Sequence, residues 1–149
     1  MKKHKVLFLC TGNSARSQMA EAFLRHYGGE YFEAYSAGRE ERGINPLTTR
    51  VMEEHGFDMS EARSKSVREY LGYQRFEYVI IVCRRADSNC PTVFPEASHY
   101  QRWIFDDPVK SEGTDEERLA VFRATRDRIE ARVKLWIEET LEQVGTPTS

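Results

Sequence analysis

The chain alternates short apolar runs with longer stretches in which apolar residues recur at helical spacing. The runs His4–Cys10, Tyr31–Ala37 and Glu77–Cys83 each stop at small or polar residues, which is typical of buried parallel strands. Within the third run, Val79-Ile80-Ile81-Val82 gives the strongest strand signal in the sequence. A weaker strand is predicted at Gln101–Phe105.

Three other segments have the pattern of amphipathic helices. Ser17–Tyr27 carries apolar residues at helical spacing and ends at Gly28-Gly29. A second helix is predicted to begin at Asn45-Pro46, an N-cap followed by a proline in the first turn. Thr114 and Glu117 form a capping box for the last helix. Its apolar residues repeat at helical spacing: Leu119, Phe122, Ile129, Val133, Ile137 and Leu141.

Strands that alternate with helices predict a parallel, doubly wound α/β sheet with helices on both faces. No internal repeat or linker interrupts the pattern, so residues 1–149 are expected to form a single domain. In such sheets, ligands bind beyond the carboxyl ends of the strands. Cys10, Cys83 and the residues after Phe105 are expected at that edge.

Composition narrows the possible partners. Of the 149 residues, 40% are hydrophobic and 31% are charged, which is ordinary for a soluble globular protein. A formal net charge of -2 gives no general attraction to nucleic acid or to anionic membranes, so neither is an expected partner. The apolar run Val6-Leu7-Phe8-Leu9 is too short for a signal peptide, and no stretch is long enough to span a bilayer. We expect a cytoplasmic protein, and nothing demands more than a monomer.

The three cysteines, Cys10, Cys83 and Cys90, are an odd number and too few for a disulfide scaffold. In a reducing compartment such cysteines are more often reactive or metal-binding than structural. Their spacing matches no common zinc pattern. The four histidines are scattered and have no evident partners: His4, His26, His55 and His99. The sequence therefore predicts no metal site and no cofactor.

The segment Cys10-Thr11-Gly12-Asn13-Ser14-Ala15-Arg16-Ser17 joins the end of a strand to the start of a helix. Its small residues let the backbone curl so that successive N–H groups point at one oxyanion. The helix N-terminus adds unpaired N–H groups and a positive dipole end. Asn13 suits the left-handed turn conformation that fixes such a loop. We therefore expect an oxyanion site formed by the loop residues Thr11, Gly12, Asn13, Ser14, Ala15 and Arg16.

The same loop supplies candidate catalytic side chains. Arg16 can hold two oxygens of a bound anion bidentately. The positive field of the loop favours the thiolate form of Cys10, and Ser17 can donate a hydrogen bond to that thiolate. The plainer interpretation is an apolar strand cysteine followed by an ordinary turn. It leaves the placement of Arg16 and Ser17 unexplained.

This loop, together with Ser36-Ala37-Gly38 and Asp107-Pro108, resembles the low-molecular-weight protein tyrosine phosphatase superfamily. The resemblance runs from about Lys5 to the last helix and rests on three motifs in order. It implies a four-stranded parallel sheet with strand order 2-1-3-4 and the anion loop at its switch point. It also implies that Asp107 is the general acid that protonates the leaving oxygen. On the residues alone, Asp106-Asp107-Pro108 is better interpreted as a solvated turn before the last helix; the resemblance favours Asp107 over Asp106 as the acid.

A phosphatase needs one cysteine, and Cys83 and Cys90 are additional. Two thiols that form a disulfide supply the two electrons that convert As(V) to As(III). In this detail the sequence resembles the thioredoxin-coupled arsenate reductases of the superfamily, which carry a cysteine pair after the third strand. The resemblance implies that Cys10 attacks arsenate and that Cys83 and then Cys90 pass on the disulfide. Thioredoxin or a similar thiol reductant would restore the thiols, and phosphate or sulfate would bind as analogues of arsenate.

The spacing of the two additional cysteines constrains the segment between them. If residues 83–90 were helical, about 10.5 Å of axial rise would separate the cysteines. A disulfide tolerates a Cα separation of only about 4.4–6.8 Å. We therefore expect a loop, or a helix that unwinds on oxidation. The competing interpretation of Cys83 is a buried strand residue, because it directly follows Val82.

Two other functions remain open. A tyrosine phosphatase of this superfamily would hydrolyse aryl phosphates through a Cys10 phospho-enzyme. Here Val109-Lys110 follows Pro108, where such phosphatases tend to have tyrosines. A non-catalytic anion-binding module is disfavoured by the presence of Cys10, Arg16 and Asp107.

Some family members hold a potassium ion beside the loop, through residues that match Asn13, Glu21 and Ser36 and an acidic side chain. Here the corresponding stretch is Ser64-Lys65-Ser66. A lysine there would repel the ion or replace its charge. We therefore predict no bound cation.

Overall fold

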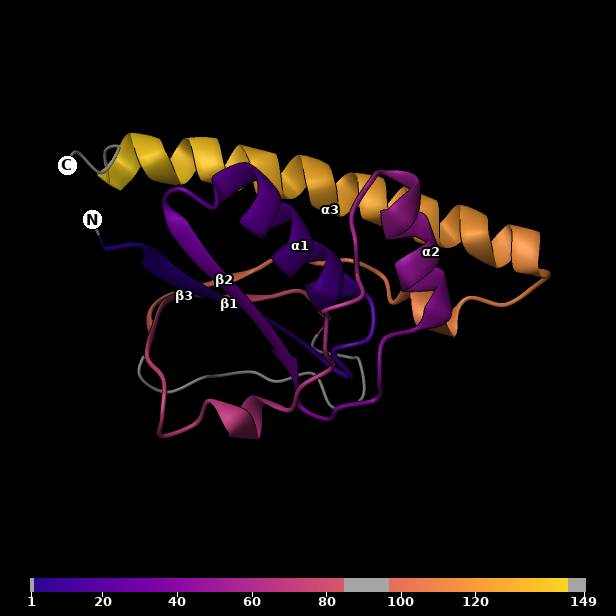
Figure 1. The fold of residues 1–149 in the computed structure, drawn as a ribbon, viewed down its shortest axis with the longest axis horizontal. Coiled ribbons are helices and arrows are strands. Elements are labelled where there is room, and N and C mark those ends of the chain that lie inside the picture. Colours follow the sequence, from indigo (N-terminus) through magenta and orange to yellow (C-terminus); the bar gives the residue numbers. More distant parts are fainter. Residues whose placement is uncertain (1, 85–96, 145–149) are drawn as a thin grey trace.

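The structure is a computed structural model that describes residues 2–84 and 97–144. Its elements follow in the order β1 His4–Cys10, α1 Arg16–Gly28, β2 Phe32–Gly38, α2 Pro46–Glu54, the 3-10 helix η1 Val67–Glu69, β3 Phe76–Ile81, β4 Ala97–Arg102, the 3-10 helix η2 Pro108–Lys110 and α3 Asp115–Val144. Figure 1 shows these elements along the chain.

The four strands form one sheet in the order β2-β1-β3-β4, and all neighbouring strands are parallel. The predicted parallel sheet with strand order 2-1-3-4 is therefore confirmed. β1 pairs with β2 as far as Cys10↔Gly38, and with β3 as far as Leu9↔Ile81. The order of the strands reverses at β1, so the loop after Cys10 lies at the switch point of the sheet.

Side chains of the sheet alternate between two apolar clusters, because successive residues of a strand point to opposite faces. One cluster joins Val6 and Phe8 to buried residues of α1, α2 and α3. In Figure 1, α3 extends along the molecule beside α1 and α2. The other cluster contains Leu7 and Leu9 and packs against Val67 of η1. Helices thus flank both faces of the described sheet, but all three α-helices pack on one of them.

α3 is held on the sheet by Trp136, which is buried. The ring centroid of Trp136 lies 4.9 Å from that of Phe32 on β2 and 5.2 Å from that of Tyr78 on β3. Such aromatic pairs each contribute about 0.5–1.5 kcal/mol beyond the burial of their surface. Tryptophan packing therefore fixes the last helix across two strands.

The predicted helix starts are confirmed by their hydrogen bonds. The side chain of Asn45 accepts from the backbone N–H of Leu47, and Pro46 stands at the first position of α2. At α3, the backbone N–H of Glu117 donates to Thr114 Oγ1 at 3.1 Å, and the backbone N–H of Thr114 donates to Glu117 Oε1 at 3.2 Å. The two contacts are the reciprocal pair of a capping box.

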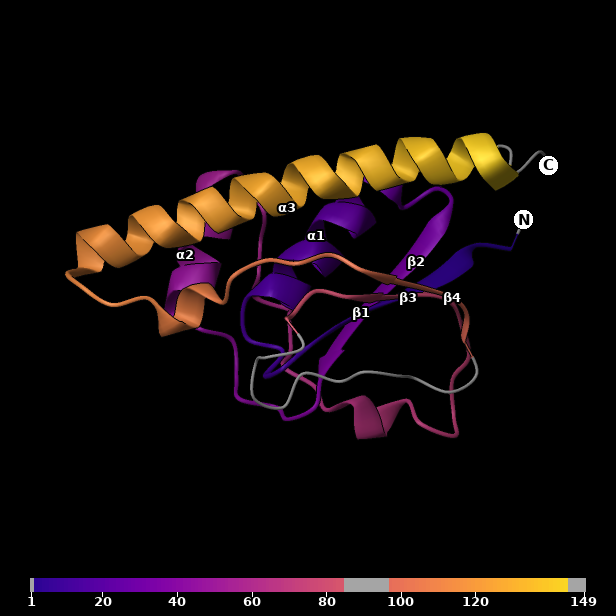
Figure 2. The ribbon, with the colours of Figure 1, turned by 180° about the vertical axis from the view of Figure 1, so that it is seen from behind.

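The fourth strand does not lie where the sequence analysis placed it. The strand was predicted at Gln101–Phe105, but β4 spans Ala97–Arg102 and pairs with β3 from Phe76↔Ala97 to Ile81↔Arg102. Figure 2 shows β4 beside β3. The side chains of β4 are mostly exposed, because it is an edge strand. The predicted strand therefore overlaps β4 only at Gln101 and Arg102.

None of the described helices has both the length and the apolar character needed to cross a membrane. α3 is long, but its first turn alone carries Asp115, Glu116 and Glu117.

Candidate active site

A cavity of about 240 Å³ opens at the carboxyl end of β1. Its walls come from the loop after β1, from the segment that leads into α2, and from the start of η2. The lining residues are Cys10, Thr11, Gly12, Ser14, Ala15, Arg16, Arg42, Gly43, Ile44, Asn45, Pro46, Asp107 and Val109. The fold thus brings together, around one cavity, residues of the loop and the aspartate that the sequence analysis selected.

Asn13 turns the loop around the sulfur of Cys10. Its φ is 50°, in the left-handed region that asparagine tolerates better than most residues. The backbone N–H of Asn13 donates to Cys10 Sγ at 3.1 Å. Asn13 is fully buried, and it contacts the sulfur rather than lining the cavity. The loop therefore aims a backbone hydrogen-bond donor at the sulfur.

The N-terminus of α1 also faces the cavity. Ala15 is its N-cap, and no side chain caps it; the first turn contains no acidic residue. The first N–H groups of a helix have no partner within the helix and carry a partial positive charge. Ala15 and Arg16 both line the cavity. The helix end is therefore available to a bound anion.

The guanidinium of Arg16 is buried beside the cavity, with 2% of its side chain exposed. Its Nη1 donates to the carbonyl oxygen of Phe105 at 3.0 Å, and its Nη2 lies 3.4 Å from Thr11 Oγ1. These contacts fix the plane of the guanidinium across the loop. A planar fork held in this way matches two oxygens of a tetrahedral anion.

Asp107 also lines the cavity and is the N-cap of η2. Its Oδ1 accepts from the backbone N–H of Val109 at 3.1 Å, and its Oδ2 lies 3.4 Å from Arg16 Nη2. Pro108 follows at the first position of η2 and restricts the backbone there. The neighbouring Asp106 is turned outward and pairs with Arg84 at 2.8 Å. The geometry therefore distinguishes the two adjacent aspartates in favour of Asp107.

Ser17 lies 2.8 Å from Cys10 Sγ, and a network of hydrogen bonds sets the direction of this contact. Asn13 Nδ2 donates to Ser17 Oγ at 2.8 Å and to Ser36 Oγ at 3.0 Å. Asn13 Oδ1 in turn accepts from Gln18 Nε2 at 2.8 Å, which fixes the orientation of the amide. Because Ser17 Oγ already accepts from Asn13, its own proton is free to be donated to the sulfur. The network therefore supplies a second donor to a thiolate at Cys10.

Lys65 joins this network through both its backbone and its side chain. The backbone N–H of Lys65 donates to Asn13 Oδ1 at 2.7 Å, and Lys65 Nζ lies 3.8 Å from Glu21 Oε1. That carboxylate oxygen also accepts from Ser36 Oγ at 2.5 Å. Burial lowers the pKa of Lys65, while Glu21 acts in the opposite direction. The position that the sequence analysis considered for a potassium ion thus has an ammonium group beside the carboxylate.

We expect Lys65→Met to lower the free energy of unfolding by about 1–3 kcal/mol, because the largely buried Glu21 carboxylate loses a cation from its inner side. Arg25 still pairs with Glu21 at 2.7 Å, which limits the loss. Denaturant unfolding measures the change, and Lys3→Met at an exposed lysine is the control. Equal stability of the Lys65 and Lys3 variants would show that the ammonium does not support the network.

The close approach of the Cys10 loop to the end of β2 requires a glycine at position 38. A Cβ at Gly38 would lie 2.6 Å from the backbone nitrogen of Asn13 and 2.8 Å from the carbonyl oxygen of Thr11. No side chain fits there unless the backbone of the loop shifts. The Ser36-Ala37-Gly38 motif is therefore part of the site: Ser36 holds Asn13, and Gly38 lets the loop approach β2.

Several residues that line or support the cavity were not among the predicted site residues. Arg42 lies over Gly12, its backbone N–H donates to the Gly12 carbonyl at 3.0 Å, and its guanidinium pairs with Glu40 at 3.0 Å. Gln18 supports Asn13 from α1. The segment that carries Arg42 has no regular structure, so periodicity gave no signal for it.

Cys83 lies just beyond β3 and is fully buried. It belongs to the cluster of Leu7 and Leu9, whereas Cys10 belongs to the cluster on the α-helical face. Its sulfur is engaged in a disulfide, while Cys10 has a free thiol. The carbonyl oxygen of Cys83 accepts from Arg102 Nη1 at 2.6 Å. The side chains of Cys10 and Cys83 therefore lie on opposite faces of the sheet, near the carboxyl ends of its two central strands.

Cys90 and the expected loop or unwinding helix between the two cysteines fall outside the described residues. The structure therefore bears on Cys83 alone among the additional cysteines. Among the residues it describes, the arrangement of a buried thiol, a guanidinium and a carboxyl group suits attack on a tetrahedral oxyanion followed by protonation of the leaving oxygen.

Comparison with known proteins agrees with this geometry. The model of a family described as low molecular weight phosphotyrosine protein phosphatase matches residues 5–146. An arsenate reductase of Halalkalibacterium halodurans is 45% identical over 138 residues, which make up 93% of this chain and 98% of that protein. The solved structure of an arsenate reductase in its phosphate-binding state has a TM-score of 0.73 and 29% identity, covering 91% of this chain and 98% of the other. The structure of a thioredoxin-dependent arsenate reductase from Corynebacterium glutamicum has a TM-score of 0.56 and 28% identity. The match covers 89% of this chain and 63% of the other.

Proposed function

Because the chain belongs to the low molecular weight phosphotyrosine protein phosphatase family, we propose that it uses this family's anion loop to reduce arsenate to arsenite. The observation that carries the proposal is the cavity in which Cys10, Arg16 and Asp107 meet. Additional support comes from relatives at 38–45% identity that are named arsenate reductases and align over nearly their whole length. Cys83, a further cysteine that is engaged in a disulfide, fits a reductase better than a hydrolase.

In the first step, the Cys10 thiolate attacks arsenic, and an As–O bond breaks as an S–As bond forms. Arg16 and the loop N–H groups hold the remaining oxygens. The leaving group is a hydroxyl of arsenate, which takes a proton from Asp107 and departs as water.

In the second step, the thiolate of Cys83 attacks Cys10 Sγ. The Cys10–Cys83 disulfide forms, the S–As bond breaks, and its electron pair stays on arsenic, which leaves as As(III). Cys90 then attacks Cys83, which frees the Cys10 thiol and forms the Cys83–Cys90 disulfide. A dithiol reductant, for which thioredoxin is our proposal, reduces that disulfide. No cofactor is required.

Cys83 packs in the cluster on the sheet face opposite that of Cys10, and its sulfur is engaged in a disulfide. The relay therefore requires the backbone after β3 to rearrange. In this structure Cys10 has a free thiol and Cys83 is engaged in a disulfide. This state corresponds to the stage of the proposed cycle after the Cys10–Cys83 disulfide has been broken. A cytoplasmic location, where thiol reductants are available, suits such a cycle.

Hydrolysis of aryl phosphates is the second candidate function, because the Cys10 loop would also accept a phosphoryl group. It is disfavoured by Val109, which lines the cavity directly after Pro108 and offers no aromatic ring to a substrate ring. Phosphate and sulfate are expected to bind as inhibitors in either case, because they share the tetrahedral oxyanion shape.

Thiol mapping after addition of arsenate without reductant tests the relay. In the fully reduced wild type, one equivalent of arsenite and a Cys83–Cys90 bond are expected, seen as the loss of two hydrogen atoms in the intact mass. Cys90→Ser is expected to stop one step earlier, with a Cys10–Cys83 bond. A wild-type chain that keeps three free thiols after exposure to arsenate would refute the proposed function.

A further inference from the structure

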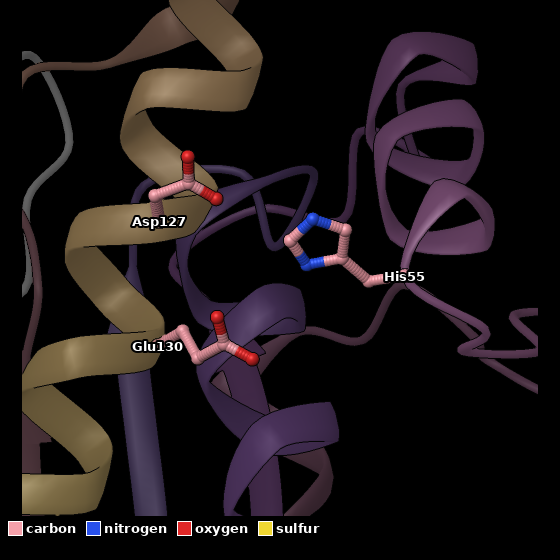
Figure 3. Close-up of side chains that lie close together, drawn as sticks. All are labelled: His55, Asp127 and Glu130. Carbon is pink, nitrogen blue, oxygen red and sulfur yellow. The ribbon is translucent and has the colours of Figure 1, made fainter.

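A second cluster of possible ligand groups lies on the helical face, away from the anion cavity. His55 is the C-cap of α2, and Asp127 and Glu130 lie on α3. Figure 3 shows the two carboxyl groups facing the imidazole ring of His55. One ligand atom of each residue lies within 4.8 Å of those of the other two. The fold therefore gathers three metal-ligand side chains that the sequence leaves far apart.

The positions of these residues follow from their elements. Asp127 and Glu130 are three residues apart, so they share one face of α3. α2 ends at His55, and Gly56, whose φ is 82°, turns the chain away directly afterwards. The imidazole is thereby left at the free end of α2, pointing across to α3. His55 and Asp127 are exposed and Glu130 is half-buried, so all three side chains can adjust their rotamers.

The chemistry of the three groups selects the kind of ion. One imidazole nitrogen and two carboxylate oxygens suit zinc and other first-row divalent ions, whereas calcium and magnesium prefer oxygen ligands alone. Ligand atoms about 2.0–2.2 Å from zinc lie roughly 3.4 Å from one another in a tetrahedral site. Binding of an ion would draw the three ligand atoms, which now lie within 4.8 Å of one another, to that separation. A water molecule would fill the fourth position.

Neighbouring groups already orient both carboxylates. Glu130 Oε2 accepts from the hydroxyl of Tyr27 at 2.7 Å, and Asp127 Oδ1 accepts from Arg126 Nε at 2.9 Å. Each of these contacts uses one carboxylate oxygen. Partners of this kind are what hold metal ligands in position from outside.

Two cations near the cluster oppose a bound metal ion: Arg126, which pairs with Asp127 at 2.9 Å, and Lys134, whose Nζ lies 4.5 Å from the ring centroid of Tyr27. The charge of Arg126 is shared with a further carboxylate. Its Nη1 pairs with Glu54 Oε1 at 2.9 Å, and Arg123 pairs with Glu54 from the other side at 2.7 Å. Glu54, Asp127 and Glu130 thus place three carboxylates beside these cations.

From this arrangement we propose that His55, Asp127 and Glu130 form a binding site for zinc or a similar divalent transition metal. The site joins the end of α2 to α3. The other end of α2 lines the anion cavity through Asn45 and Pro46. An ion bound here would therefore fix a helix whose first turn forms part of the cavity wall, and would stabilise the folded chain.

Titration of the oxidised full-length chain with Zn²⁺ by calorimetry tests the site. One ion is expected to bind per chain, and to raise the melting temperature. His55→Ala and Asp127→Asn should each weaken binding at least about tenfold, since even outer-shell partners cause losses of that size. His99→Ala, at an exposed histidine on β4, is the matched control and should bind as the wild type does.

Cysteine thiolates also bind zinc, so the donor atoms must be identified. Co²⁺ is the probe for this purpose, because thiolate ligands add an intense near-ultraviolet charge-transfer band that nitrogen and oxygen ligands lack. Weak visible bands without that absorption, lost in His55→Ala, support the site. Absence of binding to the wild type, a thiolate band, or affinity that survives both His55→Ala and Asp127→Asn would overturn the proposal. Circular dichroism of each variant confirms that it is folded.

Discussion

Arg16→Lys is expected to lower kcat/KM about 10²–10³-fold for arsenate and for an aryl phosphate alike, the loss that follows removal of one well-placed oxyanion donor. The guanidinium contacts the Phe105 carbonyl and lies beside Asp107 at once, which an ammonium group on a flexible chain cannot reproduce. Both substrates should be affected because both present a tetrahedral oxyanion. Steady-state kinetics with each substrate measures the change.

Arg39→Lys provides a control in the same neighbourhood. The backbone N–H of Arg39 donates to the Cys10 carbonyl, but its side chain is exposed. This variant should retain wild-type kinetics. A loss below tenfold in Arg16→Lys, or an equal loss in Arg39→Lys, would mean that the guanidinium of Arg16 does not hold the transition state.

Cys83→Ser is expected to abolish thioredoxin-linked reduction of arsenate while slow hydrolysis of an aryl phosphate persists. Hydrolysis needs only Cys10, Arg16 and Asp107, and water releases the phosphoryl group. Reduction needs a second thiol to take arsenite off Cys10 and leave a disulfide. Coupled thioredoxin turnover and release of aryl alcohol are measured on the same preparation.

Because Cys83 is fully buried, a polar replacement also costs stability, and Cys83→Ala serves as a second variant. Both variants should retain hydrolysis, which shows that the Cys10 loop is intact. If arsenate turnover survives in both, the role proposed for Cys83 is wrong. If hydrolysis is lost as well, the replacement has disturbed the fold, and the alanine variant decides.

Much of the site could be predicted because its signals are local. The run that ends at Cys10, the small residues after it and the helix that begins at Arg16 are adjacent in sequence, so strand, loop and helix end define an anion site together. The capping box at Thr114 is local in the same way. By contrast, Asp107 entered only through a family resemblance, since nothing near it in the sequence points to Arg16.

The features that the sequence analysis missed depend on contacts between distant segments. β4 is an exposed edge strand with few apolar residues, so the hydrophobic pattern of the sequence did not show where it begins. Lys65 joins the network of Asn13 only through the fold. His55 had no evident partner in the sequence, because Asp127 and Glu130 approach it from the last helix.

The unequal covering of the sheet determines where the chain can move at low cost. Most of the apolar surface that α1, α2 and α3 remove from water lies on the Cys10 side. Among the described residues, the Cys83 side packs against Tyr35, Val67, Tyr70 and Ala97, and no α-helix lies there. A rearrangement on that side leaves the packing of α1, α2 and α3 in place, so Cys10 can keep its geometry while Cys83 moves.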